Sequence, residues 1–257
     1  MSVFKSENAY WRFASAVLRH QRYVRETEAD EFLSALLSQA ADKVETISQG
    51  SYLWRAQLGH DWVTHDEPEG QYEEPIGFPP ERMKPLRDRA VEGRANPKGI
   101  PYLYVATRRD TALAEVRPWV GAEISAAQLR VLRDLRVVDC TRHAKRSFFI
   151  FGDTPEECWD DDVWADVDHA FSRPVAPADD VADYVPTQVI AELFKSGGFD
   201  GVAYASAVGE GHNIALFDLD SVAVHGCAVH SLKSIEFKFD QSSNAYVVSS
   251  EADAGSG

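Results

Sequence analysis

The pattern of apolar residues changes near residue 50, and this change limits the folds that the chain can adopt. Residues 7–48 carry apolar side chains at helical spacing, which predicts two helices. After them come short runs rich in β-branched and aromatic residues, bounded by glycine and proline, as strands usually are. Because strands outnumber helices in this second part, we predict an α+β fold with a mixed β core.

The same change suggests a division of the chain. We expect a helical N-terminal extension over residues 1–48, a main domain over 49–248 and a flexible tail over 249–257. A length of 257 residues with 44% hydrophobic content is enough for one large domain with an appendage.

Within the main domain the expected strands are "SYLWRAQLG", "PYLYVAT", "LRVVDC", "FDGVAYAS" and "IALFDL". The expected helices are "TALAEVRPWV", capped by Thr107 or Asp110, "SAAQLRVLRD" and "YVPTQVIAELFKSGG". Residues 60–98 hold six prolines and many charges, so we expect a long loop with at most short helices. Residues 235–248 resemble a β-hairpin.

The charge balance excludes several kinds of partner. A net charge of -15 repels phosphate backbones and anionic lipids, so we expect neither direct nucleic-acid binding nor membrane binding. We find no apolar run of about 18 residues and no signal peptide, and three cysteines imply no disulfide framework. These features predict a cytoplasmic protein.

Positive charge is nevertheless concentrated in one stretch, residues 93–119. This stretch surrounds a single helical glutamate, Glu115, with five cations: Arg94, Lys98, Arg108, Arg109 and Arg117. A local cationic site on an acidic protein indicates an anionic small molecule rather than a polyanion.

Two arginines are candidate phosphate ligands. Arg94 lies in "GRANPKG", where glycine and proline impose a turn, and a planar guanidinium there can hold phosphate oxygens in pairs. The alternative is an ordinary exposed turn arginine. Arg55 lies among apolar strand residues, where a charge is costly unless it is paired, so it serves either a ligand or a structural ion pair.

Three further side chains are candidates for the chemistry. Glu115 is surrounded by small and apolar helix residues, so its carboxylate is expected to be partly buried and able to stabilise a cation or act as a base. Tyr104 can stack on an aromatic ring, or belong to the core. Ser206 follows an apolar strand without a G-x-S-x-G elbow, which makes it a better hydrogen-bonding group than nucleophile.

Other patterns in the sequence indicate no further chemistry. We read the acidic stretch around residues 152–171 as a solvated helix face. His225, Cys227 and His230 lack a further ligand pair, so we expect no metal site. The P-loop and dinucleotide-binding glycine motifs are absent from the sequence.

Taken together, these residues resemble the RES family of bacterial toxins, named for an arginine, a glutamate and a serine. The resemblance rests on "LWRA", "GRANPKGIPYLYVATRRDTALAEV" and "GFDGVAYASAVGEGHNIALFD", and covers residues 50–220. Arg94 and Tyr104 are 10 residues apart, and Tyr104 and Glu115 are 11. Many relatives have a tryptophan after the arginine, where this chain has Ala95.

The resemblance implies an enzyme that destroys NAD+, with a core similar to ADP-ribosyltransferases. It implies cleavage of the bond between nicotinamide and ribose, with inorganic phosphate or water as acceptor. NAD+ is then the substrate, no other cofactor is required, and the expected partner is a helix-turn-helix (Xre-like) antitoxin. A homodimer is a further expectation.

The resemblance also assigns roles to the candidate residues. Arg55 and Arg94 would hold phosphates, Tyr104 would stack on nicotinamide, and Glu115 would stabilise the ribosyl cation. Ser206 would hydrogen-bond the ribose or nicotinamide side, supported by Asn213. Two alternatives remain open: transfer of ADP-ribose to a macromolecule, and a catalytically silent protein-binding module that uses the acidic stretch and the N-terminal helices.

Overall fold

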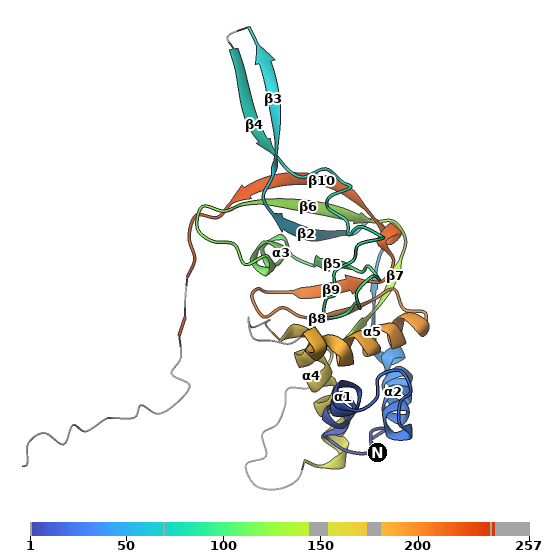
Figure 1. Cartoon of the computed structure of the whole chain (residues 1–257). Helices are drawn as coiled ribbons and strands as arrows, with labels where there is room; N and C mark the ends of the chain where they lie inside the picture. The colour runs from blue at the N-terminus through green and yellow to red at the C-terminus, as the bar shows by residue number, and fades with distance from the viewer. Residues whose placement is uncertain (1, 69, 144–153, 174–180, 237, 240–257) are drawn as a thin grey trace, which may run out of the picture.

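The computed structural model describes residues 2–68, 70–143, 154–173, 181–236 and 238–239. The predicted tail, 249–257, lies outside these residues, and so does most of the hairpin expected over 235–248. Among the described residues the dominant element is an eight-stranded sheet with the strand order β1-β7-β8-β9-β5-β2-β6-β10. A separate two-stranded hairpin, β3-β4, projects away from the body of the protein (Figure 1).

The sheet is mixed, because β7 and β8 pair in parallel and the other pairs are antiparallel. Its strands are β1 (Val44–Ile47), β2 (Tyr52–Leu58), β5 (Leu103–Ala106), β6 (Glu123–Val131), β7 (Leu135–Asp139), β8 (Gly201–Ala205), β9 (His212–Leu216) and β10 (Val222–Ser231). The hairpin comprises β3 (Asp61–Glu67) and β4 (Gly70–Ile76). The predicted α+β class with a mixed sheet is confirmed.

Four helices gather at one end of the sheet (Figure 1). They are α1 (Ala9–Arg19), α2 (Thr27–Ala40), α4 (Trp159–Ser172) and α5 (Val185–Ser196). A short helix, α3 (Arg109–Glu115), follows β5. Single 3-10 turns are η1 (Ala41–Lys43), η2 (Glu156–Cys158), η3 (Val181–Tyr184) and η4 (Leu219–Ser221). No helix of the described residues is long and apolar enough to cross a membrane.

Two apolar clusters hold the fold together, one on each side of the sheet. The outer cluster joins the helices to the sheet and contains the fully buried Phe13, Leu36, Trp164 and Phe194. The inner cluster contains residues from strands in both halves of the sheet. They include Leu53, Leu103, Leu129, Val137 and Leu216. Because β2 and β7 contribute to one cluster although three strands separate them in the sheet, the sheet curls around its own side chains.

Three predicted elements are wrong. "SAAQLRVLRD" contains good helix formers, but its first part lies in β6, where burial between β2 and β10 overrides helix propensity. The expected loop at 60–98 contains β3 and β4, because Pro75 lies on a strand with an exposed edge, where a missing N–H is tolerated. The last part of the predicted second helix, Val44–Ile47, is β1, paired with β7. The division into 1–48 and 49–248 remains a prediction.

Two finer expectations are also corrected. Helix α3 begins after Arg108, and neither Thr107 nor Asp110 caps it. The acidic stretch forms α4, but this helix is not a wholly solvated face, because Asp166 and Asp168 are only 3% and 9% exposed. The Asp168 carboxylate accepts a hydrogen bond from the N–H of Ala205 at 2.9 Å, which ties α4 to the end of β8.

Candidate functional site

Glu115, the last residue of α3, accepts two hydrogen bonds at a single oxygen. Its Oε1 accepts from the Ser206 hydroxyl at 2.7 Å and from the Asn213 side-chain amide at 2.6 Å. Within the described residues Oε2 accepts no hydrogen bond, so one carboxylate oxygen remains for a ligand. The expected partial burial of Glu115 is wrong: Thr111 and Ala112 face the core, but the helix ends at the surface and the glutamate is exposed.

Two adjacent strands deliver the two donors to Glu115. Ser206 follows β8 directly and Asn213 is the second residue of β9, with the glycine-rich turn 207–211 between them. Gly211 has a φ of +86°, a conformation that glycine adopts without strain. We expected Asn213 to support Ser206, but both side chains bind the same oxygen of Glu115. The sequence motif therefore brings the glutamate, serine and asparagine together.

Tyr104 on β5 is held at its hydroxyl by the turn that contains Arg94. The hydroxyl donates to Asn96 Oδ1 at 2.8 Å and accepts from the N–H of Ala95 at 2.9 Å. Burial raises the pKa of Tyr104 to about 12, so this hydroxyl is protonated at neutral pH. A Cβ at Gly93 would lie only 2.6 Å from the hydroxyl oxygen, so the turn requires glycine there.

Helix α5 fixes the same turn from its other side. The Thr187 hydroxyl donates to the carbonyl of Arg94 at 2.5 Å. The Gln188 side chain donates to the carbonyls of Gly93 and Asn96 at 2.9 and 3.1 Å. Ala95 is fully buried and packs in the outer cluster, which anchors the turn beside Arg94. The backbone of Arg94 is therefore rigidly placed.

The guanidinium of Arg94 keeps one donor unused. Its Nη1 donates to the carbonyl of Ala170 on α4 at 3.1 Å, and its carbon lies 5.2 Å from the centre of the Tyr184 ring. Its Nη2 is buried and has no hydrogen-bond acceptor among the described residues. Arg94 is therefore not an ordinary exposed turn arginine, and its remaining donor suits an anionic oxygen.

Arg55 on β2 is half-buried, and it has no countercharge among the described residues. Its Nη1 donates to the carbonyl of Tyr104 at 3.2 Å, and its Nε is buried without an acceptor. Burial lowers the pKa of Arg55 to about 10, and in the described part of the chain no carboxylate lies within 4.0 Å of it. The structural ion pair considered above is therefore not found, and Arg55 can meet a ligand.

Two adjoining hollows connect these groups, since Glu115, Tyr204 and Asn213 line both. One, of about 290 Å³, is also lined by Arg55 and Tyr104. The other, of about 320 Å³, is also lined by Arg94, Arg117 and Arg173. Four arginines thus face these hollows, and Glu115 is the one carboxylate among their described lining residues. This arrangement suits a ligand that carries several negative charges near a group that becomes positive.

The cations singled out in the sequence do not all contribute. Only Arg94 and Arg117 line a hollow. Arg108 pairs with Glu210 at 2.8 Å and Arg109 with Asp110 at 3.3 Å. Lys98 lies in the turn that follows Asn96, outside the described lining of both hollows.

The sequence patterns did not identify several residues of the site. Asn96, which is 2% exposed, lies in the turn "GRANPKG" directly before Pro97, and a polar residue at that place in a turn was the available sequence signal. Tyr204 precedes Ser206 by two residues and therefore shares its side of β8. Its ring stacks on Phe171 with centroids 5.5 Å apart. Arg173 carries no local sequence signal, because the fold alone brings the end of α4 beside Arg94.

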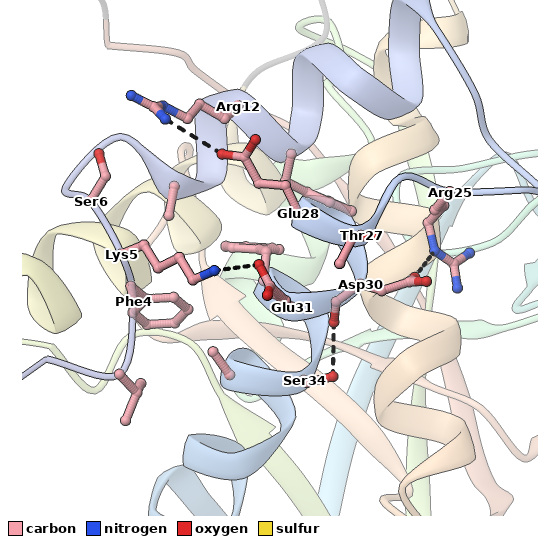
Figure 2. Close-up of a pocket in the computed structure, with 15 residues that line it drawn as sticks. Phe4, Lys5, Ser6, Arg12, Arg25, Thr27, Glu28, Asp30, Glu31 and Ser34 are labelled. Atoms are coloured by element: carbon pink, nitrogen blue, oxygen red, sulfur yellow. Dashed lines mark hydrogen bonds and ion pairs between the residues drawn. The ribbon is translucent and has the colours of Figure 1, made fainter.

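A larger hollow, of about 460 Å³, lies between the N-terminal segment and α2 (Figure 2). Its charged side chains already pair with one another across the space: Lys5 with Glu31 at 2.5 Å, Arg12 with Glu28 at 3.4 Å and Arg25 with Asp30 at 2.8 Å. Since these cations are neutralised, this hollow lacks the unpaired donors found around Glu115.

Comparison with known proteins places the site within a family. The family model described as "RES domain" matches residues 52–240, which include every candidate site residue. No curated protein matches the chain. Among solved structures, the M. tuberculosis MbcT-MbcA toxin-antitoxin complex has a chain similar to this one, at 16% identity and a TM-score of 0.40, over 77% of this chain and 92% of that one.

Proposed function

Since the chain belongs to the RES domain family, we propose that it cleaves the bond between nicotinamide and ribose in NAD+. The observation that carries the proposal is the pairing of Glu115 with unused arginine donors. Arg55 Nε and Arg94 Nη2 are buried without acceptors among the described residues, and the two arginines line hollows that share Glu115, a carboxylate with one uncommitted oxygen. A dinucleotide supplies phosphate oxygens for the arginine donors and a developing positive charge for the carboxylate.

The reaction follows from this distribution of charge. As the bond between the nicotinamide nitrogen and ribose C1′ breaks, its electron pair leaves with nicotinamide, which becomes neutral. The positive charge then develops on the ribose, where the Glu115 carboxylate stabilises it. An oxygen of phosphate or water then bonds to C1′ in place of the nicotinamide nitrogen, and water loses a proton in doing so.

The hydrogen bonds to Glu115 position it for this role. Ser206 and Asn213 both donate to Oε1, which fixes the orientation of the carboxylate and leaves Oε2 for the substrate. Tyr104, fixed through Asn96, presents its ring to the nicotinamide. Arg55 and Arg94 bind the pyrophosphate, and Arg117 and Arg173 extend the cationic lining toward an acceptor phosphate.

We further propose that the chain acts as the toxin of a toxin–antitoxin pair in the cytoplasm, with a helix-turn-helix (Xre-like) antitoxin, and that it associates with itself as a homodimer. The resemblance to RES toxins supports this part. The test is to express this chain together with the protein encoded by the neighbouring gene and to purify one of them. Copurification of the two would support the proposal, and failure of the two proteins to bind each other would contradict it.

Product analysis tests the enzymatic proposal. Purified protein is incubated with NAD+ with and without inorganic phosphate, and products are identified by mass spectrometry and phosphorus NMR. Phosphorylated ADP-ribose with nicotinamide indicates a phosphorylase, and free ADP-ribose a hydrolase. Intact NAD+ in both reactions, from folded protein free of antitoxin, would contradict the proposal.

A further inference from the structure

A second polar cluster lies away from Glu115, on the inner side of the curled sheet. Glu45 on β1, Asp139 on β7 and His212 on β9 each place one potential ligand atom within 4.8 Å of the other two. Residues two apart on a strand point to the same side of the sheet. The residues two positions from Glu45, Asp139 and His212 are Ile47, Val137 and Ile214, and all three pack in the inner cluster. Strands from separate parts of the chain therefore bring together two carboxylates and an imidazole.

Asp139 is the buried member of the cluster, at 4% exposure. One of its oxygens accepts from the N–H and the hydroxyl of Thr141, at 3.0 and 2.7 Å. No basic side chain of the described residues lies within 4.0 Å of its carboxylate. Because a buried carboxylate without a countercharge is costly, the site is suited to a cation.

There is also space beside the cluster. Glu45 and His212 line a hollow of about 270 Å³, together with the hydroxyl-bearing Ser48, Ser51 and Thr107. This hollow lies on the opposite face of the sheet from Glu115. Its described lining residues include none of those that line the two hollows beside Glu115. A cation bound to the cluster would have room for coordinating water.

We propose that Glu45, Asp139 and His212 bind a divalent transition metal, for which Zn²⁺ is the first probe. Carboxylate and imidazole ligands together suit such a metal better than Mg²⁺ or Ca²⁺, which prefer oxygen alone. Ligand atoms in tetrahedral coordination at about 2.0–2.2 Å lie roughly 3.4 Å apart. The ligand atoms here lie within 4.8 Å of one another, so the side chains have to close by about an ångström on binding, and the exposed Glu45 is the freest of the three to move.

This site differs from the cysteine and histidine group considered in the sequence, and its role would be structural. Glu45 precedes the segment that matches the RES domain, and Asp139 and His212 lie within it. The metal therefore ties β1 to β7 and β9 of the domain. His212 is followed by Asn213, which bonds Glu115 from the other side of β9, so the metal also steadies the strand that positions the carboxylate.

The test uses the full chain after removal of metals with a chelator. Isothermal titration with Zn²⁺ should give one site per chain, and the thermal midpoint should rise with Zn²⁺ concentration. Glu45→Gln and His212→Gln should each weaken binding at least about tenfold. Glu45 is exposed, so its substitution leaves the fold intact. The matched controls are His65→Gln and Glu74→Gln, which remove a carboxylate–imidazole pair 3.0 Å apart on the hairpin and should leave binding unchanged.

Mn²⁺ gives a second readout, because its electron paramagnetic resonance spectrum changes on binding and should respond to the same substitutions. The proposal is overturned if the metal-free chain binds neither ion. It is equally overturned if Glu45→Gln and His212→Gln bind Zn²⁺ as tightly as the unsubstituted chain, or if Ca²⁺ competes with Zn²⁺ on equal terms.

Discussion

Gly93→Ala provides a quantitative test of how the arginine turn is held. The added Cβ would lie 2.6 Å from the Tyr104 hydroxyl oxygen, 2.9 Å from Asn96 Oδ1 and 3.1 Å from the Tyr104 ring carbon. Tyr104 cannot simply retreat, because it is paired with Ala215 in the sheet. The turn must therefore move away, and its hydrogen bonds to Tyr104 weaken.

The cost can be estimated from these contacts. Loss of two hydrogen bonds costs about 0.5–1.5 kcal/mol each. Overpacking costs about 1–3 kcal/mol more, and the reduced conformational freedom of alanine in the unfolded chain restores about 0.4–1 kcal/mol. These ranges sum to a fall in the free energy of unfolding of about 1–6 kcal/mol, with a central value of about 3 kcal/mol, to be measured by urea denaturation followed by circular dichroism. The substitution should also lower NAD+ turnover, because Arg94 moves with the turn.

The matched control is Gly226→Ala, where an added Cβ meets no atom within 4 Å and the free energy should change by less than about 0.5 kcal/mol. Adding Tyr104→Phe to Gly93→Ala should recover part of the lost stability, since the closest clashing atom is removed. The reasoning is refuted if Gly93→Ala unfolds within about 0.5 kcal/mol of the unsubstituted chain, or if the two substitutions are strictly additive.

One further substitution and one pH titration test the burial of these side chains. Arg55→Met should leave stability unchanged or raise it, because an unpaired and half-buried charge is removed, while NAD+ binding by calorimetry weakens at least about tenfold; a large loss of stability would indicate a structural ion pair instead. Burial raises the pKa of Tyr104 to about 12 and those of Tyr10, Tyr102 and Tyr204 further, so tyrosinate absorbance at about pH 11 should stay below that of the unfolded chain. Because these folded-state pKa values exceed the unfolded ones, the contribution of the four tyrosines to stability is complete below about pH 10 and is lost progressively as the pH rises, for Tyr104 through about 12 and for the others at higher pH; full ionisation of all tyrosines at pH 11 in folded protein would contradict this.

Sequence patterns predicted the elements whose local signals agree with their surroundings. A continuous apolar run before a glycine-rich loop marked β8, and the glycine pair after Ser196 marked the end of α5. The pattern failed where the tertiary structure decides, as in β6, whose alanine-rich sequence favours a helix but whose two neighbouring strands bury it. Local propensity carries no information about such long-range pairing.

The same contrast holds for the site. The sequence named Glu115, Ser206 and Asn213, but it could not show that the last two share one oxygen of the first. It also missed Thr187 and Gln188, which hold the arginine turn from a helix more than 90 residues away in the sequence. Contacts over such separations depend on how α5 packs, which no local motif encodes.

The most direct test of the account is nicotinamide release from NAD+ by the unsubstituted chain and by Glu115→Gln. Glutamine keeps an oxygen that accepts from Ser206 and Asn213, so the variant should fold and bind NAD+ normally. Because it lacks the negative charge that stabilises the ribosyl cation, its turnover should fall by about 10²–10³. Turnover within about tenfold of the unsubstituted chain would contradict the central role of Glu115, and an unsubstituted chain that releases no nicotinamide would contradict the proposed function itself.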